Sequence, residues 1–453
     1  MTKHLFLTLS IALAAEAFSP KALAGDLDYS QGVFILNEDW YGHQNSTLNY
    51  LLPDDPNGDY WHYRVIQAEN PGIEIGCTAQ HGAIFEGRLY LIAKQDKDPG
   101  ATVTGGRITV ADASTLRVLH QSQLIDPSGA TCDGRGFLGV TAQKGYISTS
   151  NGIWVLDLVT NEVTGMIAGT GSTSATGSLY EGQCGSMVIA AGKVFAAHQQ
   201  LGLLVIDAAT DQLLSTISLA EVDPDAGIGS VVKALDGSLW VSVAYGTDGT
   251  GLTLPYLMRV NPQTLATEVV NLEQDGIFPP NNSWYAWTPD TFCASYQTNT
   301  LYWCGGDSWF GSPYIFKFDI DTRTATRIVD LDAEGDDWHV YGCSMRIHPD
   351  TDEIYASLLH QVSDPTYILR RYDSDGTYIT DYPMISNYWF PSLPFFPTAP
   401  DTSALLLPIP TDPDADTPIR YYDLQGREID PATAPAGLYI RKEGPSSTLL
   451  HLP

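Results

Sequence analysis

The chain has 453 residues, of which 53 are acidic and 23 basic, giving a formal net charge of −30. A field of this sign repels nucleic acids and anionic membrane surfaces, which argues against both as partners. The length fits one large β domain or two to three ordinary domains. Beyond the N-terminus, no run approaches the roughly 18–20 apolar residues of a membrane-spanning helix.

The first 24 residues are typical of a secretory signal peptide. Lys3 precedes the apolar stretch LFLTLSIALAA, and residues 22–24 read Ala-Leu-Ala, a small-residue cleavage site. We therefore expect an exported protein, either secreted or on the outer face of the outer membrane. No cysteine follows this segment directly, so a lipoprotein anchor has no attachment point.

Residues 29–400 alternate short runs rich in Val, Ile, Tyr, Phe and Trp with turns of Gly, Asp, Asn and Pro, and helix signals are almost absent. One unit reads as four strands, GSMVIA, KVFAAH, GLLVIDA and QLLSTISL. Its last turn runs from Asp207 to Thr210, a D-x-x-T pattern in which aspartate binds its own backbone. Six such units begin near Cys77, Cys132, Cys184, Val231, Cys293 and Cys343.

The two ends of this region complete a seventh unit. Three strand-like runs, VFILNE, STLNYLL and YWHYRVI, precede Cys77 without a first strand, and one run, NYWFPSLPFFP, follows the sixth unit. A radial array closes when strands from the N-terminus complete the last unit. We therefore predict an all-β fold, a seven-bladed β-propeller with four strands per blade. An open solenoid or two β-sandwiches would leave the split unit unexplained.

The composition changes after Pro400. Residues 401–418 include PIPTDPDADTP, a Pro/Asp-rich stretch that predicts a linker. Residues 419–453 offer about three short strands, too few for a robust independent core. We expect a small C-terminal β module that is either an appendage or a sorting domain.

The cysteines are even in number, which permits disulfides in an exported protein. Cys293 and Cys304 flank the hairpin CASYQTNTLYWC, whose register can bring its ends together, so we predict a disulfide between them. The sequence does not choose among the three pairings of the other four cysteines. No C-x₂-C pair is present, which argues against a zinc site. The four unassigned cysteines are Cys77, Cys132, Cys184 and Cys343.

The propeller geometry sorts the loops onto two faces. First-to-second and third-to-fourth turns share the lower face, and they are short and polar. Second-to-third loops and blade-to-blade connections share the upper face, where aromatic residues collect. A concave face with aromatic walls and convergent polar tips is the default hypothesis for a ligand site. The predicted ligand-binding residues are Trp40, Tyr41, His43, Gln80, His81, Tyr180, Gln183, Gln199, Tyr245, Trp284, Tyr285, Trp309, Phe310, Trp338, Tyr341, Tyr388 and Trp389.

The loop NEDWYGHQN, residues 37–45, belongs to the split seventh blade. Ring closure therefore predicts that Trp40, Tyr41 and His43 lie near Tyr388 and Trp389, although nearly 350 residues separate them. These rings either grip a ligand or fasten the ring shut. Several of the other aromatic residues could likewise plug the central tunnel or pack between blades.

No catalytic residue, cofactor or metal ligand is predicted. Motifs of metalloproteases, α/β-hydrolases, P-loop proteins and dinucleotide-binding enzymes are missing. A glycan hydrolase or lyase on the upper face is an alternative, because paired carboxylates perform that chemistry. Among 53 acidic residues, however, adjacent carboxylates occur by chance. A propeller that binds another surface protein, as an adhesion or scaffold module, is a third reading.

Residues 30–398 resemble the YncE-like surface β-propellers of gut bacteria, on segments such as GVFILNEDWYGHQNSTLNYL, GCTAQHGAIF, SWYAWTPDTFCAS and YGCSMRIHPDTDEIYASL. Their best-understood members are BtuG-type corrinoid-binding proteins. The resemblance implies capture of a corrinoid of the vitamin B12 type and delivery to an outer-membrane TonB-dependent transporter. It assigns no individual contact residue. The tail YYDLQGREI is similar to modules that direct type IX secretion, although STLLHLP differs from their usual basic ending.

Overall fold

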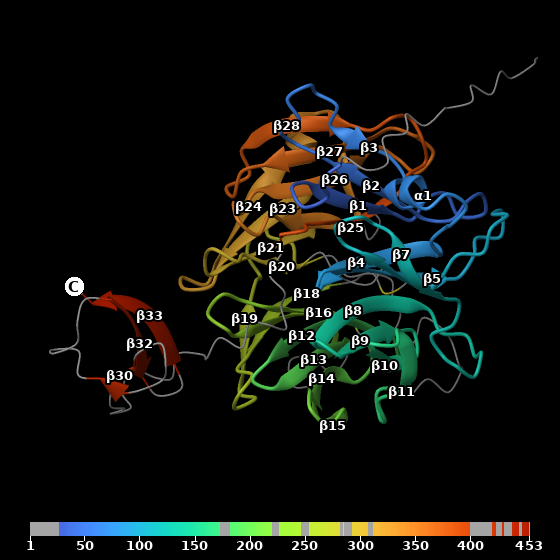
Figure 1. Cartoon of the computed structure of the whole chain (residues 1–453). Coiled ribbons are helices and arrows are strands. Elements are labelled where there is room, and N and C mark those ends of the chain that lie inside the picture. Colours follow the sequence, from blue (N-terminus) through green and yellow to red (C-terminus); the bar gives the residue numbers. More distant parts are fainter. Residues whose placement is uncertain are drawn as a thin grey trace, which may run out of the picture.

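The structure is a computed structural model that describes residues 27–172, 182–219, 226–245, 253–280, 284, 292–306, 311–398, 419–422, 428–429, 437–443 and 446–452. Seven β-sheets follow one another in chain order around a central axis (Figure 1). The predicted seven-bladed β-propeller is confirmed. Within the described residues the helices are short, α1 (Val65–Glu69) and α2 (Leu331–Glu334).

Blades 1 to 4 each take four consecutive antiparallel strands. Blade 1 contains β4 (Cys77–Phe85), β5 (Arg88–Gln95), β6 (Ile108–Asp112) and β7 (Val118–Ser122). Blade 2 contains β8 (Gly134–Thr141), β9 (Lys144–Thr149), β10 (Gly152–Asp157) and β11 (Glu162–Met166). Blade 3 contains β12 (Cys184–Ala190), β13 (Lys193–His198), β14 (Gly202–Asp207) and β15 (Gln212–Ile217). Blade 4 contains β16 (Ala226–Lys233), β17 (Leu239–Tyr245), β18 (Thr253–Val260) and β19 (Thr267–Asn271).

Blades 5 and 6 continue the same order, with one addition. The two-residue strand β22 (Gly311–Ser312) leaves blade 5 and pairs with the first strand of blade 6. Blade 5 contains β20 (Cys293–Ala294), β21 (Thr300–Gly305), β23 (Tyr314–Asp319) and β24 (Thr324–Asp330). Blade 6 contains β25 (His339–Ile347), β26 (Ile354–Leu359), β27 (Tyr367–Tyr372) and β28 (Tyr378–Pro383).

Blade 7 closes the ring with strands from both ends of the propeller. Its order is β29 (Pro391–Phe395), β1 (Val33–Asn37), β2 (Thr47–Leu51) and β3 (Trp61–His62). The closing ladder places Phe34 opposite Phe395 and Leu36 opposite Leu393. The rings of Phe34 and Phe395 lie 5.2 Å apart. The predicted one-plus-three blade is therefore confirmed.

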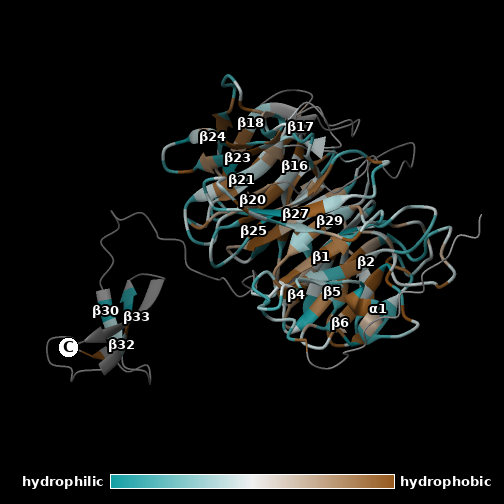
Figure 2. Ribbon diagram, turned by 90° about the horizontal axis from the view of Figure 1, so that it is seen from above, coloured by the Kyte–Doolittle hydropathy of each residue, from teal (hydrophilic) through white to brown (hydrophobic). Residues whose placement is uncertain are grey.

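The hydrophobic core is a series of clusters between neighbouring blades. Phe34 and Tyr50 of blade 7 pack with Leu89 and Leu91 of blade 1, for example. Similar buried clusters join each later pair of blades around the ring. Strand alternation produces this arrangement, because each blade must bury both faces against its two neighbours. The hydrophobic strands of the blades contrast with their hydrophilic turns in Figure 2.

The third-to-fourth turns repeat one polar device. Asp207 Oδ1 accepts hydrogen bonds from the backbone N–H groups of Ala209 (3.0 Å) and Thr210 (2.8 Å), as the D-x-x-T pattern predicts. Asp211, four residues after Asp207, adopts a left-handed backbone conformation with φ of 58°. The acceptor role of Asp207 recurs at Asp112, Asp157, Asn261, Asp319 and Asp373.

Basic side chains connect several of these turns to the preceding blade. Arg88 of blade 1 donates to the carbonyl of Leu158 at 2.6 Å. Lys144 of blade 2 donates to the carbonyl of Ala208 at 2.7 Å and forms an ion pair with Asp211 at 2.5 Å. These contacts link successive blades on the lower face, and sequence reasoning did not find them.

The C-terminal residues form a separate sheet. Its strands, in the order β31, β30, β32 and β33, are antiparallel. Their bounds are β30 (Ile419–Tyr422), β31 (Glu428–Ile429), β32 (Gly437–Glu443) and β33 (Ser446–Leu452). Throughout the part of the chain that the structure describes, no helix has the length and hydropathy required to span a bilayer.

The predicted Cys293–Cys304 disulfide is not formed in the structure, where all six cysteines are buried thiols. The register explains this result. Cys293 lies opposite Tyr302, so Cys304 is a diagonal neighbour two residues farther along β21. Diagonal neighbours in antiparallel strands are about 7–8 Å apart, beyond the roughly 4.4–6.8 Å Cα separation of a disulfide.

Candidate functional site

An exposed aromatic group stands on the upper face where blade 7 meets blade 6. The loop between β1 and β2 carries Trp40, whose ring stacks on His43 at 3.7 Å and lies 4.2 Å from Tyr388. Trp40 is 41% exposed and Tyr41 56% exposed. The predicted meeting of this loop with residues 388–389 is confirmed. We call Trp40, Tyr41, His43 and Tyr388 the rim.

Buried carboxylates hold the rim loop in place. Asp98, from the loop between β5 and β6, is fully buried and accepts hydrogen bonds from the backbone N–H groups of Gly42 and Gly100, both at 2.7 Å. The two loops approach so closely that a Cβ on Gly100 would lie 2.3 Å from the Gly42 carbonyl oxygen. The rim is therefore assembled before any ligand arrives.

Asp39 fixes the base of the same loop. Its backbone has a left-handed φ of 59°, a strained conformation for a residue with a side chain. Its buried carboxyl group accepts hydrogen bonds from Gln44 and from Thr47, the latter at 2.6 Å. Burial raises the pKa of Asp39 to about 8, against the opposing effect of these hydrogen bonds.

A second Trp–His pair lies on the upper face of blade 6. The rings of Trp338 and His360 stack at 3.6 Å, and His360 Nδ1 lies 3.3 Å from an Asp364 carboxylate oxygen. Tyr388 connects the two aromatic groups, because its hydroxyl donates to the carbonyl of Ser363 at 3.2 Å in the same blade 6 loop. The aromatic surface thus extends over two neighbouring blades.

Below the rim, the innermost strands of several blades depart from regular pairing at about the same height. The ladders of β4, β8, β12, β16, β25 and β29 all shift register near their upper ends. A bulge places an extra residue outside the regular alternation and can redirect its side chain. The extra residues include Gln80 on β4, Arg135 on β8, Tyr341 on β25 and Ser392 on β29.

Three of these residues and Glu38 form a hydrogen-bond network across four blades. Arg135 Nη1 donates to Gln80 Oε1 at 3.4 Å, and Gln80 Nε2 donates to Glu38 Oε1 at 2.8 Å. The Tyr341 hydroxyl donates to Glu38 Oε2 at 3.2 Å. Glu38 immediately precedes the Asp39–Trp40 segment, so the network is continuous with the base of the rim. The Lys94 ammonium lies close enough to act on the Glu38 carboxylate, and we call Glu38, Gln80, Lys94, Arg135 and Tyr341 the mouth cluster.

Burial controls the ionisation of the mouth cluster. Burial raises the pKa of Glu38, although the nearby Lys94 ammonium and the bonds from Gln80 and Tyr341 oppose this effect. Burial, and next the charge of Arg135, lower the pKa of Lys94 to about 7. Strongly perturbed titratable groups beside a concave surface are typical of functional sites.

Apart from the rim and Gln80, the predicted residues divide into three groups. Gln183, Gln199, Trp284, Tyr341 and Trp389 are buried. Trp284 belongs to the core between blades 3 and 4, and its indole donates to the Ile228 carbonyl. Trp389 stacks on Tyr63 at 5.2 Å. His81 and Trp338 are half-buried. The structure does not describe Tyr180, Tyr285, Trp309 and Phe310, nor the side chain of Tyr245.

Sequence reasoning missed Glu38, Lys94 and Arg135. A signal for two of them was present, because Lys94 ends the apolar run LYLIAK and Arg135 stands between two glycines in an inner strand. A charge in a strand that should face the core is rarely placed there without a partner or a function. The bulge that redirects Arg135 has no comparable sequence signal.

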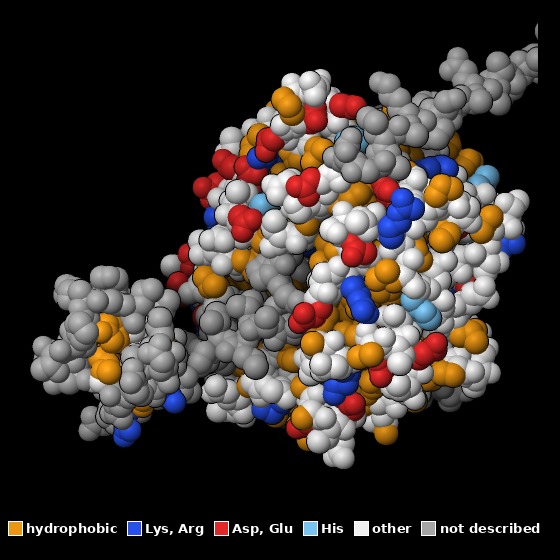
Figure 3. All heavy atoms as spheres, viewed as in Figure 1, with side chains coloured by type: hydrophobic (Ala, Val, Ile, Leu, Met, Phe, Trp, Pro, Cys, Tyr) orange, Lys and Arg blue, Asp and Glu red, His pale blue; other side chains and the backbone are white. Residues whose placement is uncertain are grey.

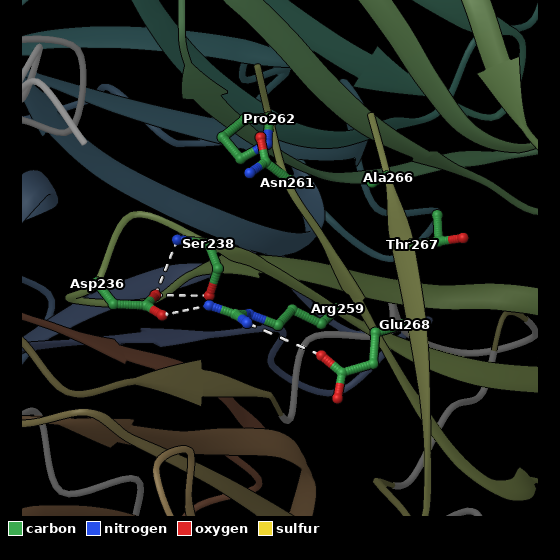
Figure 4. A pocket seen from close by; sticks show the side chains of 8 residues that line it. All are labelled: Asp236, Ser238, Arg259, Asn261, Pro262, Ala266, Thr267 and Glu268. Atoms are coloured by element: carbon green, nitrogen blue, oxygen red, sulfur yellow. Dashed lines mark hydrogen bonds and ion pairs between the residues drawn. The ribbon is translucent and has the colours of Figure 1, made fainter. Parts of the chain in front are cut away.

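A separate cavity of about 210 Å³ lies on the lower face of blade 4. In it Arg259 forms ion pairs with Asp236 at 2.8 Å and Glu268 at 3.8 Å (Figure 4). The charged side chains that line this cavity pair with one another, and the cavity lies on the face opposite the rim. Within the described residues, no group of three or more His, Cys, Asp or Glu side chains could hold a metal ion.

The fold and its mouth define a β-propeller with an open aromatic face. The profile of the family described as Domain of unknown function (DUF5074) matches residues 31–397, and the chain belongs to this family. No curated protein sequence matches the chain.

Several solved structures are similar to the chain at low identity. Two structures of the extracellular domain of BT4673 from B. thetaiotaomicron share 11% identity over 84% and 79% of this chain, with TM-scores of 0.44 and 0.47. The chain spans only 39% and 44% of those proteins. A protein of unknown function from Bacteroides caccae shares 12% identity over 63% of this chain and 93% of its own, with a TM-score of 0.37. The family membership rests on the profile match alone.

Proposed function

We propose that the protein is an exported binding protein that captures a bulky ligand on the rim, above the mouth cluster. The observation that carries this proposal is the exposed Trp40–His43 stack beside Tyr388. A large ring exposed to water gains free energy when a ligand covers it. Because Asp98 and Asp39 already fix the loop, little conformational entropy is lost on binding.

We propose a corrinoid of the vitamin B12 type as the ligand. The sequence resemblance to BtuG-type propellers supports this choice. The rim offers stacking surface for a flat-sided molecule, and Glu38, which is only half-buried, lies directly below it. Delivery of the captured ligand to a TonB-dependent transporter of the outer membrane completes the proposal.

Titration of cyanocobalamin into the full chain tests the proposal. We expect saturable binding at micromolar protein, observed as heat and as a change in the corrinoid absorption spectrum. Binding that weakens in Trp40→Ala would locate the ligand on the rim. A titration without heat or spectral change would exclude the corrinoid.

A further inference from the structure

The mouth of the propeller carries charges opposite to those of the chain as a whole. The chain has a net charge of −30, and acidic side chains outnumber basic ones over blades 5 and 6 in Figure 3. In contrast, Lys94, Arg135 and Arg346 approach one another from β5, β8 and β25 near the axis. Of the described acidic residues, Glu38 joins them directly, while Asp133 forms an ion pair with Arg107 at 3.3 Å.

These cations are buried and adjacent, which folding alone does not favour. Lys94 is 8% exposed and Arg135 1% exposed. Removing a charge from water costs several kcal/mol, and a second charge of the same sign nearby adds repulsion. The repulsion is evident at Lys94, whose pKa the Arg135 charge helps to lower. A protein retains such an arrangement when a ligand of opposite charge compensates it.

A small polar recess lies beside Arg135. Gly136 faces Ser148 and His81, since a Cβ at Gly136 would lie 2.8 Å from Ser148 Oγ and 3.9 Å from His81 Nδ1. Ser148 is fully buried, and its Oγ finds no hydrogen-bond partner in the described part of the chain. His81 Nε2 is buried and likewise has no partner among those residues. Both groups can donate a hydrogen bond.

We infer that the mouth cluster and this recess form a subsite for an oxyanion, a phosphate-type or carboxylate group, held by Lys94 and Arg135 with Ser148 and His81 as hydrogen-bond donors. The inference deepens the proposed function, because the oxyanion would be the anionic group of a ligand whose flat portion covers the rim. A free inorganic oxyanion has the same chemistry and would occupy the same subsite.

Inorganic sulfate is the suitable probe, because it remains a dianion throughout the pH range of interest. Sulfate is titrated into the full chain by calorimetry, with chloride keeping the ionic strength constant. We expect saturable binding that Lys94→Met weakens about tenfold or more, as for other close charge pairs. Gly136→Ala should also weaken binding without changing the charge, because its methyl group fills the recess.

Arg259→Gln is the matched control, because it removes one cation from the lower face. It should leave sulfate binding unchanged. Loss of binding in this variant equal to that in Lys94→Met would show general charge attraction and overturn the inference. Absence of saturable binding to the wild-type chain would also overturn it, as would unchanged binding in Lys94→Met.

The pH profile gives a second readout. Lys94 is faced by Glu38 from the end of β1, Cys77 on β4, and Asp133 and Arg135 at the start of β8. Sulfate binding should weaken as the pH rises from 6 to 8 and Lys94 loses its proton. In Lys94→Met this pH dependence should disappear, and its persistence would contradict the role of Lys94.

Competition distinguishes the source of the oxyanion. If the anionic group of the ligand occupies the subsite, sulfate should weaken cyanocobalamin binding to the wild-type chain but not to Lys94→Met. Sulfate binding without competition would assign the subsite to a free oxyanion. Sulfate binding without cyanocobalamin binding would exclude the corrinoid and keep the subsite, whereas the reverse result would exclude the subsite alone.

Discussion

The substitution Trp40→Ala separates a binding role of the rim from a purely structural one. Trp40 is 41% exposed, and a tryptophan of about 250 Å² therefore leaves about 100 Å² for a ligand to cover. At about 25 cal/mol per Å², full coverage contributes about 2.5 kcal/mol. That free energy corresponds to about a 70-fold increase in Kd when the ring is removed. Calorimetric titration of cyanocobalamin into both chains measures this change.

The same substitution should affect folding only modestly. Trp40 loses ring contacts with His43 and Tyr388, and such pairs contribute about 0.5–1.5 kcal/mol each. Trp389 is the matched comparison, because it is 2% exposed and belongs to the neighbouring core cluster. Trp389→Ala should lower the free energy of unfolding by about 3–5 kcal/mol. A Trp40→Ala chain that binds as tightly as wild type but unfolds as easily as Trp389→Ala would refute the binding role.

Three further predictions concern the scaffold. Phe34→Ala should lower the free energy of unfolding by about 3–5 kcal/mol in urea titrations, because the fully buried ring joins the two ends of the propeller; a change below about 1 kcal/mol would contradict the closing role. Hydrogen bonds from Thr210, and then Ala209, lower the pKa of Asp207, so its contribution to stability is present above the ordinary aspartate pKa and lost as pH falls through the lowered value. Asp207→Asn should keep the melting temperature at pH 7, because Asn261 already fills the equivalent position in blade 4. It should reduce the fall in melting temperature between pH 5 and pH 3. An unchanged fall in melting temperature would exclude Asp207 as a contributor. Finally, a thiol reagent should detect six thiols per unfolded chain and almost none in the folded chain, and fewer than six after unfolding would reveal a disulfide.

The fold was predictable because each blade repeats its own local signals. The D-x-x-T turn at Asp207 binds its backbone as expected, and the one-plus-three count of terminal strands predicted how the ring closes. That closure also placed Trp40 beside Tyr388, a contact between residues that no local pattern relates.

The site was predictable only in part, because a residue on a surface loop can still bury its side chain. Trp284 and Trp389 come from upper-face connections, yet each turns inward to fill a gap between blades. The mouth cluster depends on bulges in the inner strands, and a one-residue shift in register reverses the face that a side chain occupies. Register likewise separates Cys293 from Cys304, which a hairpin read from sequence alone brings together.

A structure of the full chain with cyanocobalamin bound would decide whether the rim holds the ligand. We expect the corrin ring to lie against Trp40 and Tyr388. A ligand bound in the lower-face cavity beside Arg259, or at any position that leaves Trp40 uncovered, would contradict it.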